Sequence, residues 1–168
     1  TPLQAATVYA AIANNGLKVK PTLIKNEINT LNERLISETT SHQLQKILRK
    51  VVTDENGTAS LADIHGYSVS GKTGTSQNYN NKKNINTFVS FFDIDEKKKY
   101  TLLVLLEDPK IAKNLIYDYR GQKIKALRNE AGWNAVYVAG KIIEKIGPIL
   151  AINKEEFETK NVVKKTSY

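Results

Sequence analysis

The sequence predicts an α+β fold in which antiparallel strands are covered by helices. Two apolar, β-rich runs at 87–92 and 100–107 are joined by the charged stretch 93–99, which is typical of a hairpin. Hairpin-connected strands form an antiparallel sheet, and helices must cover its apolar surface. The helical patterns lie before and after these strands instead of alternating with them, so a parallel βαβ sheet is not indicated.

The first predicted helix begins at the N-terminus. Thr1 suits the capping position, Pro2 suits the first helical position, and Gln4 completes a capping box. The Asn-Asn-Gly sequence at 14–16 ends this helix, because glycine can adopt the left-handed conformation that follows the last turn. The segment 19–28 is predicted to be extended.

A second helix is predicted from Thr40, with Gln43 completing another capping box. Its apolar residues recur at helical spacing, at Leu44, Ile47, Leu48, Val51 and Val52. The Asn-Gly pair at 56–57 ends this helix, and a short third helix capped by Thr58 is predicted over 58–63.

A strand and a loop precede the hairpin. Alternating Ser, Val and Thr residues predict a strand at 67–75. The Asn-rich stretch 76–86 is predicted to be a mobile loop. The next residues, after the hairpin, are predicted to be loop-like over 110–132.

A last helix closes the predicted domain. Its apolar face runs over 134–146, and the Gly-Pro pair at 147–148 is predicted to end it. The domain is therefore predicted to cover 1–152. The highly charged stretch 153–168 is predicted to be a flexible C-terminal tail.

Composition excludes several classes of site. The 168 residues contain no Cys and two His, so the sequence predicts neither a metal site nor a cofactor. The longest purely aliphatic run, 102–106, is too short to span a bilayer. The chain begins at Thr1 and has no Met, and we expect it to be part of a longer protein.

The charge balance is basic, with 25 Lys and Arg against 17 Asp and Glu and a formal net charge of +8. One hypothesis is therefore a basic module that binds nucleic acid or another polyanion. The basic residues are scattered and are not interleaved with an aromatic platform, which favours a solvated basic surface and no nucleic-acid partner.

The segment 66–75 matches two motifs. From Gly66 to Thr73 it reads G-x-x-x-x-G-K-T, the pattern of a phosphate-binding P-loop, and a nucleotide-binding protein is an alternative hypothesis. A P-loop needs a buried strand before it and a helix that begins at its lysine. The preceding residues 61–65 are too short and polar for such a strand, and the residues after Lys72 disfavour a helix.

From Lys72 the same segment reads K-T-G-T, and further blocks follow in order along the chain. They are the T-P-L-Q helix at 1–16, G-T-A at 57–59, the K-T-G-T block at 69–77, the strands within 88–109, and A-G-W-N-A at 131–135. Together these blocks resemble the transpeptidase domain of class B penicillin-binding proteins, of the division (septal) type. The resemblance implies the β-lactamase-like transpeptidase fold, which is classed among multi-domain α and β folds, and it covers the C-terminal part of that domain.

The resemblance also implies an activity and its partners. Such enzymes are D,D-transpeptidases that cross-link peptidoglycan stem peptides ending in D-Ala-D-Ala through an acyl-serine intermediate. β-Lactam antibiotics acylate the same serine. The family further implies divisome membrane proteins as partners and an inner-membrane anchor, outside this chain, that holds the domain in the periplasm.

Two family elements are absent or misplaced. No S-x-x-K sequence, which carries the nucleophilic serine, occurs in the chain. Ser76-Gln77-Asn78 fits the S-x-N pattern, but it follows the K-T-G block instead of preceding it, so we interpret it as coincidental. We therefore expect the nucleophile in a missing upstream half of the domain, and we expect these 168 residues to be inactive alone.

The resemblance assigns roles to the K-T-G-T residues. The N–H of Thr75 would stabilise the oxyanion, and Lys72 would serve both catalysis and substrate binding. The hydroxyls of Thr73 and Thr75 would donate hydrogen bonds to the substrate carboxylate. Gly74 would leave room for the substrate backbone along the strand.

Four further residues are predicted to support the site. Gly57, Thr58 and Ala59 form the G-T-A element, which is predicted to start a helix under the site. Gly71 is predicted to permit close packing. Trp133 is predicted to be a packing anchor and not a ligand contact.

Overall fold

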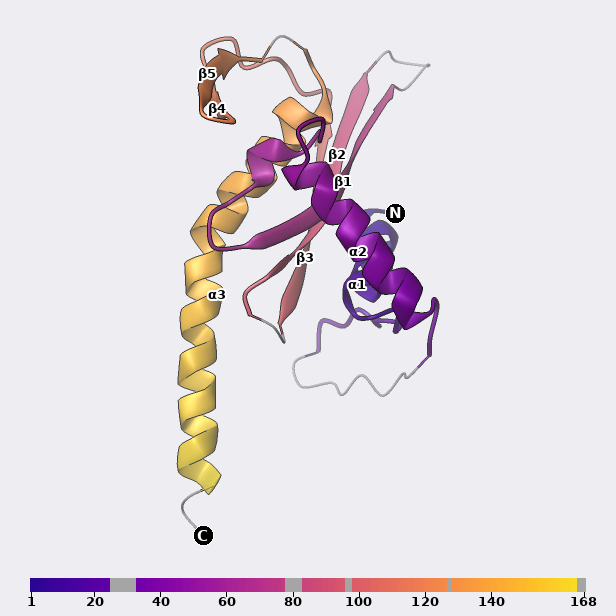
Figure 1. Ribbon diagram of the computed structural model, residues 1–168, viewed down its shortest axis with the longest axis vertical. Coiled ribbons are helices and arrows are strands. Elements are labelled where there is room, and N and C mark those ends of the chain that lie inside the picture. The colour runs from indigo at the N-terminus through magenta and orange to yellow at the C-terminus, as the bar shows by residue number, and fades with distance from the viewer. Residues whose placement is uncertain (25–32, 78–82, 96–97, 127, 166–168) are drawn as a thin grey trace.

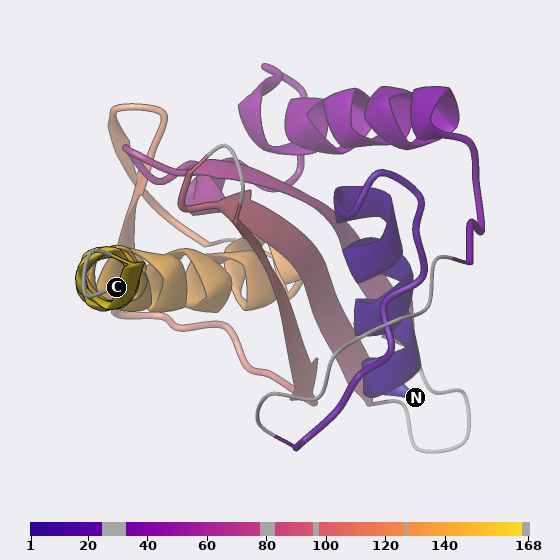
Figure 2. The same ribbon diagram turned by 90° about the horizontal axis from the view of Figure 1, so that it is seen from below.

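The computed structural model describes residues 1–24, 33–77, 83–95, 98–126 and 128–165. A three-stranded antiparallel sheet in the order β1-β2-β3 forms the centre. Helices α1 and α2 cover one face of this sheet, and α3 covers the other (Figures 1 and 2). The predicted α+β architecture is confirmed.

The sheet consists of β1 (Ser68–Gln77), β2 (Asn84–Asp93) and β3 (Lys99–Glu107). The hairpin between β2 and β3 is confirmed, with Asp93 opposite Lys99 at its end. The prediction of a loop over 76–86 is wrong at both ends, because cross-strand pairing extends β1 to Gln77 and starts β2 at Asn84. Residues 78–82 of that predicted loop lie outside the described part of the chain.

Helix α1 (Pro2–Ala13) has the predicted start. The Gln4 N–H donates to Thr1 Oγ1 at 3.3 Å, and the Thr1 ammonium donates to Gln4 Oε1 at 2.8 Å. Gly16, with a φ of +83°, follows the helix as predicted. The described part of the predicted extended segment, 19–24, has no strand, and the rest of that segment lies outside the described residues.

Helix α2 (Glu38–Thr53) begins earlier than predicted. Its cap is Ser37, whose Oγ accepts from the Thr40 N–H at 3.0 Å, so the prediction of a cap at Thr40 is wrong. Within the predicted apolar stripe, Leu48 and Val52 are buried, but Ile47 is 58% exposed. Where a third helix was predicted, only the short 3-10 helix η1 (Ser60–Ala62) forms, and Thr58 does not cap it.

Helix α3 (Ala135–Lys165) corrects the prediction that Gly147-Pro148 ends the last helix. Proline removes one backbone hydrogen bond and strains the preceding turn, but it does not always end a helix. Gly147 packs directly against the Tyr67 ring, which anchors this turn of α3 to the segment before β1. The flexible tail at 153–168 stays a prediction.

The region 110–132 is not a simple loop. It contains a second, two-stranded antiparallel sheet of β4 (Ile116–Tyr119) and β5 (Gln122–Lys125). Arg120 and Gly121 form the turn with φ values of +53° and +76°, as two-residue hairpin turns require. The 3-10 helix η2 (Ala131–Trp133) then leads into α3.

Two apolar clusters hold the layers together. The larger lies between the sheet and α3 and includes the fully buried Phe88, Phe92 and Ile143. The smaller lies on the α1 and α2 face and consists of Ala13, Leu48 and Phe91, with Tyr9 and Ile12 packed against it. Among the described helices, none is both long and apolar enough to cross a membrane.

Candidate active site

The side chains of the K-T-G-T block are divided between the two faces of the sheet, because successive residues of a strand point to opposite sides. Thr73 and Thr75 pair with Phe88 and Asn86 across the β1–β2 ladder, on the face covered by α3. Lys72 pairs with Val89 and therefore lies on the face covered by α1 and α2.

β1 is an edge strand, and its free edge carries the Lys72 ammonium. The Thr73 carbonyl accepts from Lys72 Nζ at 2.8 Å, and the Val69 carbonyl accepts from Arg49 Nη1 of α2 at 2.7 Å. In an antiparallel ladder, alternate residues direct their backbone N–H and C=O groups to the same side. The same alternation places the Thr75 N–H at this free edge.

A cavity of about 360 Å³ opens beside Thr73 and Thr75. The G-T-A element forms one side of it through Gly57 and Thr58. The remaining lining comes from Asn56, Tyr119, Arg128, Glu130 and the η2 residues Ala131, Gly132 and Trp133. Four of the sequence-predicted site residues therefore meet at one cavity, although 15 positions separate Thr58 from Thr73.

Both β1 threonines that line this cavity have a hydrogen-bond partner for their hydroxyl. Thr73 Oγ1 and Thr58 Oγ1 are 2.8 Å apart, and either can donate. Thr75 Oγ1 accepts from the Ala131 N–H at 3.1 Å. A hydroxyl has one hydrogen and two lone pairs, so a Thr75 that accepts from Ala131 keeps its own hydrogen for another acceptor.

Neighbouring atoms leave no room for a side chain at the glycines of the site. A Cβ at Gly71 would lie 2.6 Å from the Val89 carbonyl, and one at Gly57 would lie 2.5 Å from the Val51 carbonyl. At Gly74 the obstacle is Thr87 Oγ1 of β2, at 2.6 Å. Ala59 is fully buried in the larger core cluster. These residues thus hold α2, η1 and the sheet at close distances under the cavity.

Several residues at the site were not found from the sequence. Asn86, Asn129 and Asn134 form a hydrogen-bonded cluster behind η2. Trp133, predicted as a packing anchor, contacts the rings of Tyr117 and Tyr119 with centroid distances of 5.5 and 5.2 Å. Asparagine at 86, inside an apolar strand, was the available signal in the sequence.

The P-loop hypothesis is wrong. Lys72 lies in the middle of β1, and no helix begins there, so the backbone N–H groups that cradle phosphates in a P-loop are not assembled. Ser76 and Gln77 belong to the same strand, and Asn78 lies outside the described residues. The polyanion-binding hypothesis is not supported either, since basic residues in different parts of the chain pair with acidic ones, as in Lys18–Glu33 and Lys141–Glu144.

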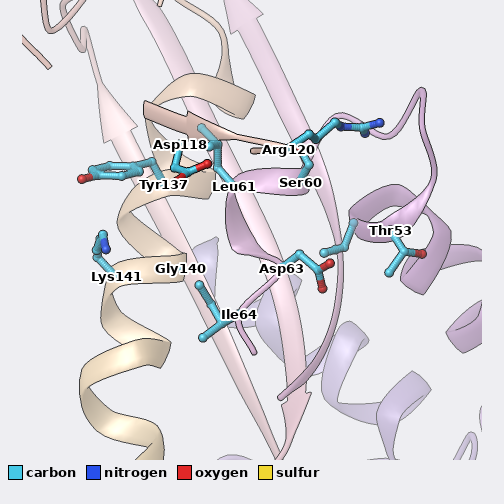
Figure 3. Close-up of a pocket in the computed structure, with 11 residues that line it drawn as sticks. Thr53, Ser60, Leu61, Asp63, Ile64, Asp118, Arg120, Tyr137, Gly140 and Lys141 are labelled. Atoms are coloured by element: carbon cyan, nitrogen blue, oxygen red, sulfur yellow. The ribbon is translucent and has the colours of Figure 1, made fainter. Parts of the chain in front are cut away.

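A second cavity, of about 440 Å³, lies between η1, the β4–β5 turn and α3 (Figure 3). Its carboxylates and its lysine pair with opposite charges, whereas the Arg120 guanidinium donates to the Asp54 carbonyl. Asp118 accepts from Lys123, which lowers the pKa of that carboxyl, and Lys141 donates to Glu144, which raises the pKa of the Lys141 amine. Asp63 pairs with Arg49 at 2.9 Å. Unlike the first cavity, it is not lined by the K-T-G-T block, and its Ser60 Oγ has no hydrogen-bond partner among the described residues.

Comparison with known proteins gives consistent matches. The model of the penicillin binding protein transpeptidase domain matches residues 1–129. A protein of Caulobacter vibrioides named as a probable peptidoglycan D,D-transpeptidase FtsI is 32% identical over 169 residues, covering 92% of this chain and 27% of the relative. The peptidoglycan D,D-transpeptidase FtsI of Buchnera aphidicola is 31% identical over 134 residues, covering 75% of this chain and 22% of that protein.

A solved structure supports the same fold. The D,D-transpeptidase domain of a peptidoglycan glycosyltransferase from Eggerthella lenta superposes with a TM-score of 0.61 at 24% identity, covering 87% of this chain and 32% of that chain. The chain thus spans about a quarter of the length of the Caulobacter relative. Because the family model matches well over half of its residues, the chain belongs to the penicillin-binding protein transpeptidase domain family.

Proposed function

We propose that this chain forms one wall of the acyl-transfer site of a serine-type peptidoglycan D,D-transpeptidase. The observation that carries the proposal is the meeting of Thr73, Thr75 and Thr58 at one cavity beside the free edge of β1. Its substrates would be stem peptides that end in D-Ala-D-Ala, and β-lactams would acylate the same serine. No cofactor is needed for this chemistry.

The free edge of β1 suits the charge that develops during acyl transfer. Attack of a serine oxygen on the D-Ala-D-Ala carbonyl forms a C–O bond and leaves an oxyanion, which then collapses and expels D-alanine. The Thr75 N–H at the edge would donate to this oxyanion. One such donor contributes about a hundredfold to a thousandfold in rate.

The hydroxyl face of β1 suits the terminal carboxylate of the substrate. Thr73 and Thr75 would each donate one hydrogen bond to a carboxylate in the cavity. Lys72 Nζ, at the free edge through its hydrogen bond to the Thr73 carbonyl, would supply positive charge nearby. Gly74 would then lie under the substrate backbone. The atom that a Cβ at Gly74 would meet is Thr87 Oγ1 of β2.

The nucleophile would come from residues outside this sequence. The printed chain contains no S-x-x-K, so we propose that these 168 residues alone form no stable adduct with penicillin. In the full-length gene product, an upstream half of the domain would supply the serine. A membrane anchor, a periplasmic location and divisome partners belong to the same proposal.

The test is acylation of the full-length gene product by a fluorescent penicillin. We expect Lys72→Ala to slow acylation by about a hundredfold or more, because a charge at the reacting centre is lost. Lys110→Ala is the matched control, since Lys110 is exposed and pairs with Asp108 away from the cavity. Equal labelling of the two variants would contradict the role of Lys72, and labelling of the 168-residue chain alone would contradict the missing nucleophile.

A further inference from the structure

Asn86 is a fully buried polar residue in the middle strand of an apolar sheet. Its Oδ1 has no hydrogen-bond partner among the residues that the structure describes. An unpaired buried acceptor lowers stability, so stability alone would favour an apolar side chain at this position. Asn86 lies directly opposite Thr75 in the β1–β2 ladder, which places it behind the proposed oxyanion strand.

The amide nitrogen of Asn86 is hydrogen-bonded to the segment that carries η2. Asn86 Nδ2 lies 3.2 Å from Asn134 Oδ1 and 3.3 Å from Asn129 Oδ1. Asn134 Nδ2 donates to the same Asn129 oxygen at 3.0 Å. The two partners lie on either side of η2 (Ala131–Trp133), so this cluster fixes both ends of η2 against β2.

The segment fixed in this way returns to Thr75. Ala131, the first residue of η2, donates its N–H to Thr75 Oγ1 at 3.1 Å. A closed ring of contacts therefore runs from Thr75 across the ladder to Asn86, through Asn129 and Asn134 to η2, and back to Thr75. Both the backbone and the hydroxyl of Thr75 are held by this ring.

We infer that Asn86 is a positioning residue for Thr75 in acyl transfer, acting through Asn129, Asn134 and the Ala131 N–H. This inference rests on the proposed function. The Ala131 N–H occupies one lone pair of Thr75 Oγ1 and leaves the hydroxyl hydrogen for substrate. The ring also fixes the position of the Thr75 N–H. A displacement of about 1 Å in such a group lowers the rate about a hundredfold.

The experiment compares Asn86→Ala with Ser90→Ala in the full-length gene product. Ser90 is the matched control because it is fully buried on the same face of β2, and its hydroxyl bonds the Leu102 carbonyl of β3 instead of η2. Two quantities are measured with a fluorescent penicillin, the acylation rate constant and the Kd of the non-covalent complex. Hydrogen exchange of the peptide covering 129–135 is measured in parallel.

We expect Asn86→Ala to slow acylation about tenfold to a hundredfold, with a smaller change in Kd, because the lost geometry matters most in the transition state. Exchange across 129–135 should become faster. Ser90→Ala should leave the rate constant within about twofold and that exchange unchanged, although both variants lower the melting temperature. Equal rate constants for the two variants would overturn the inference.

Two further outcomes are informative. If Asn86→Ala does not fold, Asn129→Ala breaks the same link at a half-buried position, and an unchanged acylation rate in that variant would overturn the inference. Unchanged exchange of 129–135 in Asn86→Ala would overturn it without reference to activity. A wild-type protein that penicillin does not acylate would overturn the proposed function itself, a result distinct from these.

Discussion

At the scale of single residues, the direction of one hydroxyl hydrogen affects what the cavity can bind. Thr58 Oγ1 lies 2.8 Å from Thr73 Oγ1. If Thr58 donates, the Thr73 hydrogen is free for a substrate carboxylate, and the pair forms a short relay toward it. From the sequence, Thr58 was predicted to cap a helix. Its contact with Thr73 connects the G-T-A element directly to the site.

Thr58→Val should therefore weaken non-covalent binding of penicillin by the full-length gene product. The substitution keeps the side-chain shape and removes the hydroxyl, and a lost hydrogen bond of about 1 kcal/mol corresponds to about fivefold in Kd. The acylation rate constant should change less than the Kd. Thr58→Ser keeps the hydroxyl and is the control, so equal Kd values for the valine and serine variants would contradict the relay.

The contacts that complete the site show where sequence reasoning stops. Lys72 to Thr75 could be identified because their motif is contiguous. Their partners are distant in sequence, since Ala131 is 56 positions from Thr75. Asn86, which lies opposite Thr75 in the ladder, is 48 positions from its own partner Asn134. Only the folded sheet and η2 bring them together, so no local pattern could have indicated that these residues are in contact.

At the scale of elements, capping and turn residues such as Thr, Asn, Gly and Pro predicted some ends of helices and strands correctly and others wrongly. The hairpin of β2 and β3 and the start of α1 followed from local patterns. The β4–β5 hairpin was missed because its strands are four residues each, too short to show a period. The Gly147-Pro148 pair was misread because its glycine serves a tertiary contact with Tyr67.

Substitutions at this pair should separate packing from helix propensity. Propensity alone predicts that both Gly147→Ala and Pro148→Ala stabilise a helix, by about 1 and up to about 3 kcal/mol. A Cβ at Gly147 would instead overlap the Tyr67 ring, so we expect that variant to lower the free energy of unfolding by about 1–3 kcal/mol. Pro148 is exposed, so we expect Pro148→Ala to raise the free energy of unfolding.

Denaturant unfolding of the 168-residue chain measures both effects. Opposite signs for the two variants are expected. Stabilisation by Gly147→Ala would show that α3 does not press against Tyr67 at this turn. Destabilisation by Pro148→Ala would show that the chain depends on the proline for the course of α3.

At the scale of the whole molecule, the two faces of the sheet are stabilised unequally. Among the described residues, the larger cluster on the α3 face contains twelve buried residues, of which Val52 comes from the end of α2, whereas the cluster on the α1 and α2 face contains three. α1 contributes only the buried alanines Ala11 and Ala13. Large apolar side chains of this layer, including Leu3, Val8 and Ile47, remain exposed. The α1 layer should therefore open more easily than the α3 layer, because less apolar area is buried there.

Two core substitutions and hydrogen exchange test this asymmetry in the 168-residue chain. Ile143→Ala removes a fully buried side chain from the larger cluster and should cost about 3–5 kcal/mol of unfolding free energy. Leu48→Ala acts on the smaller cluster, where neighbours can collapse into the space, and should cost about 2 kcal/mol. Amides of α1 should exchange well before those of β2. Equal costs, together with equal protection of α1 and β2, would show instead that both layers unfold as one cooperative unit.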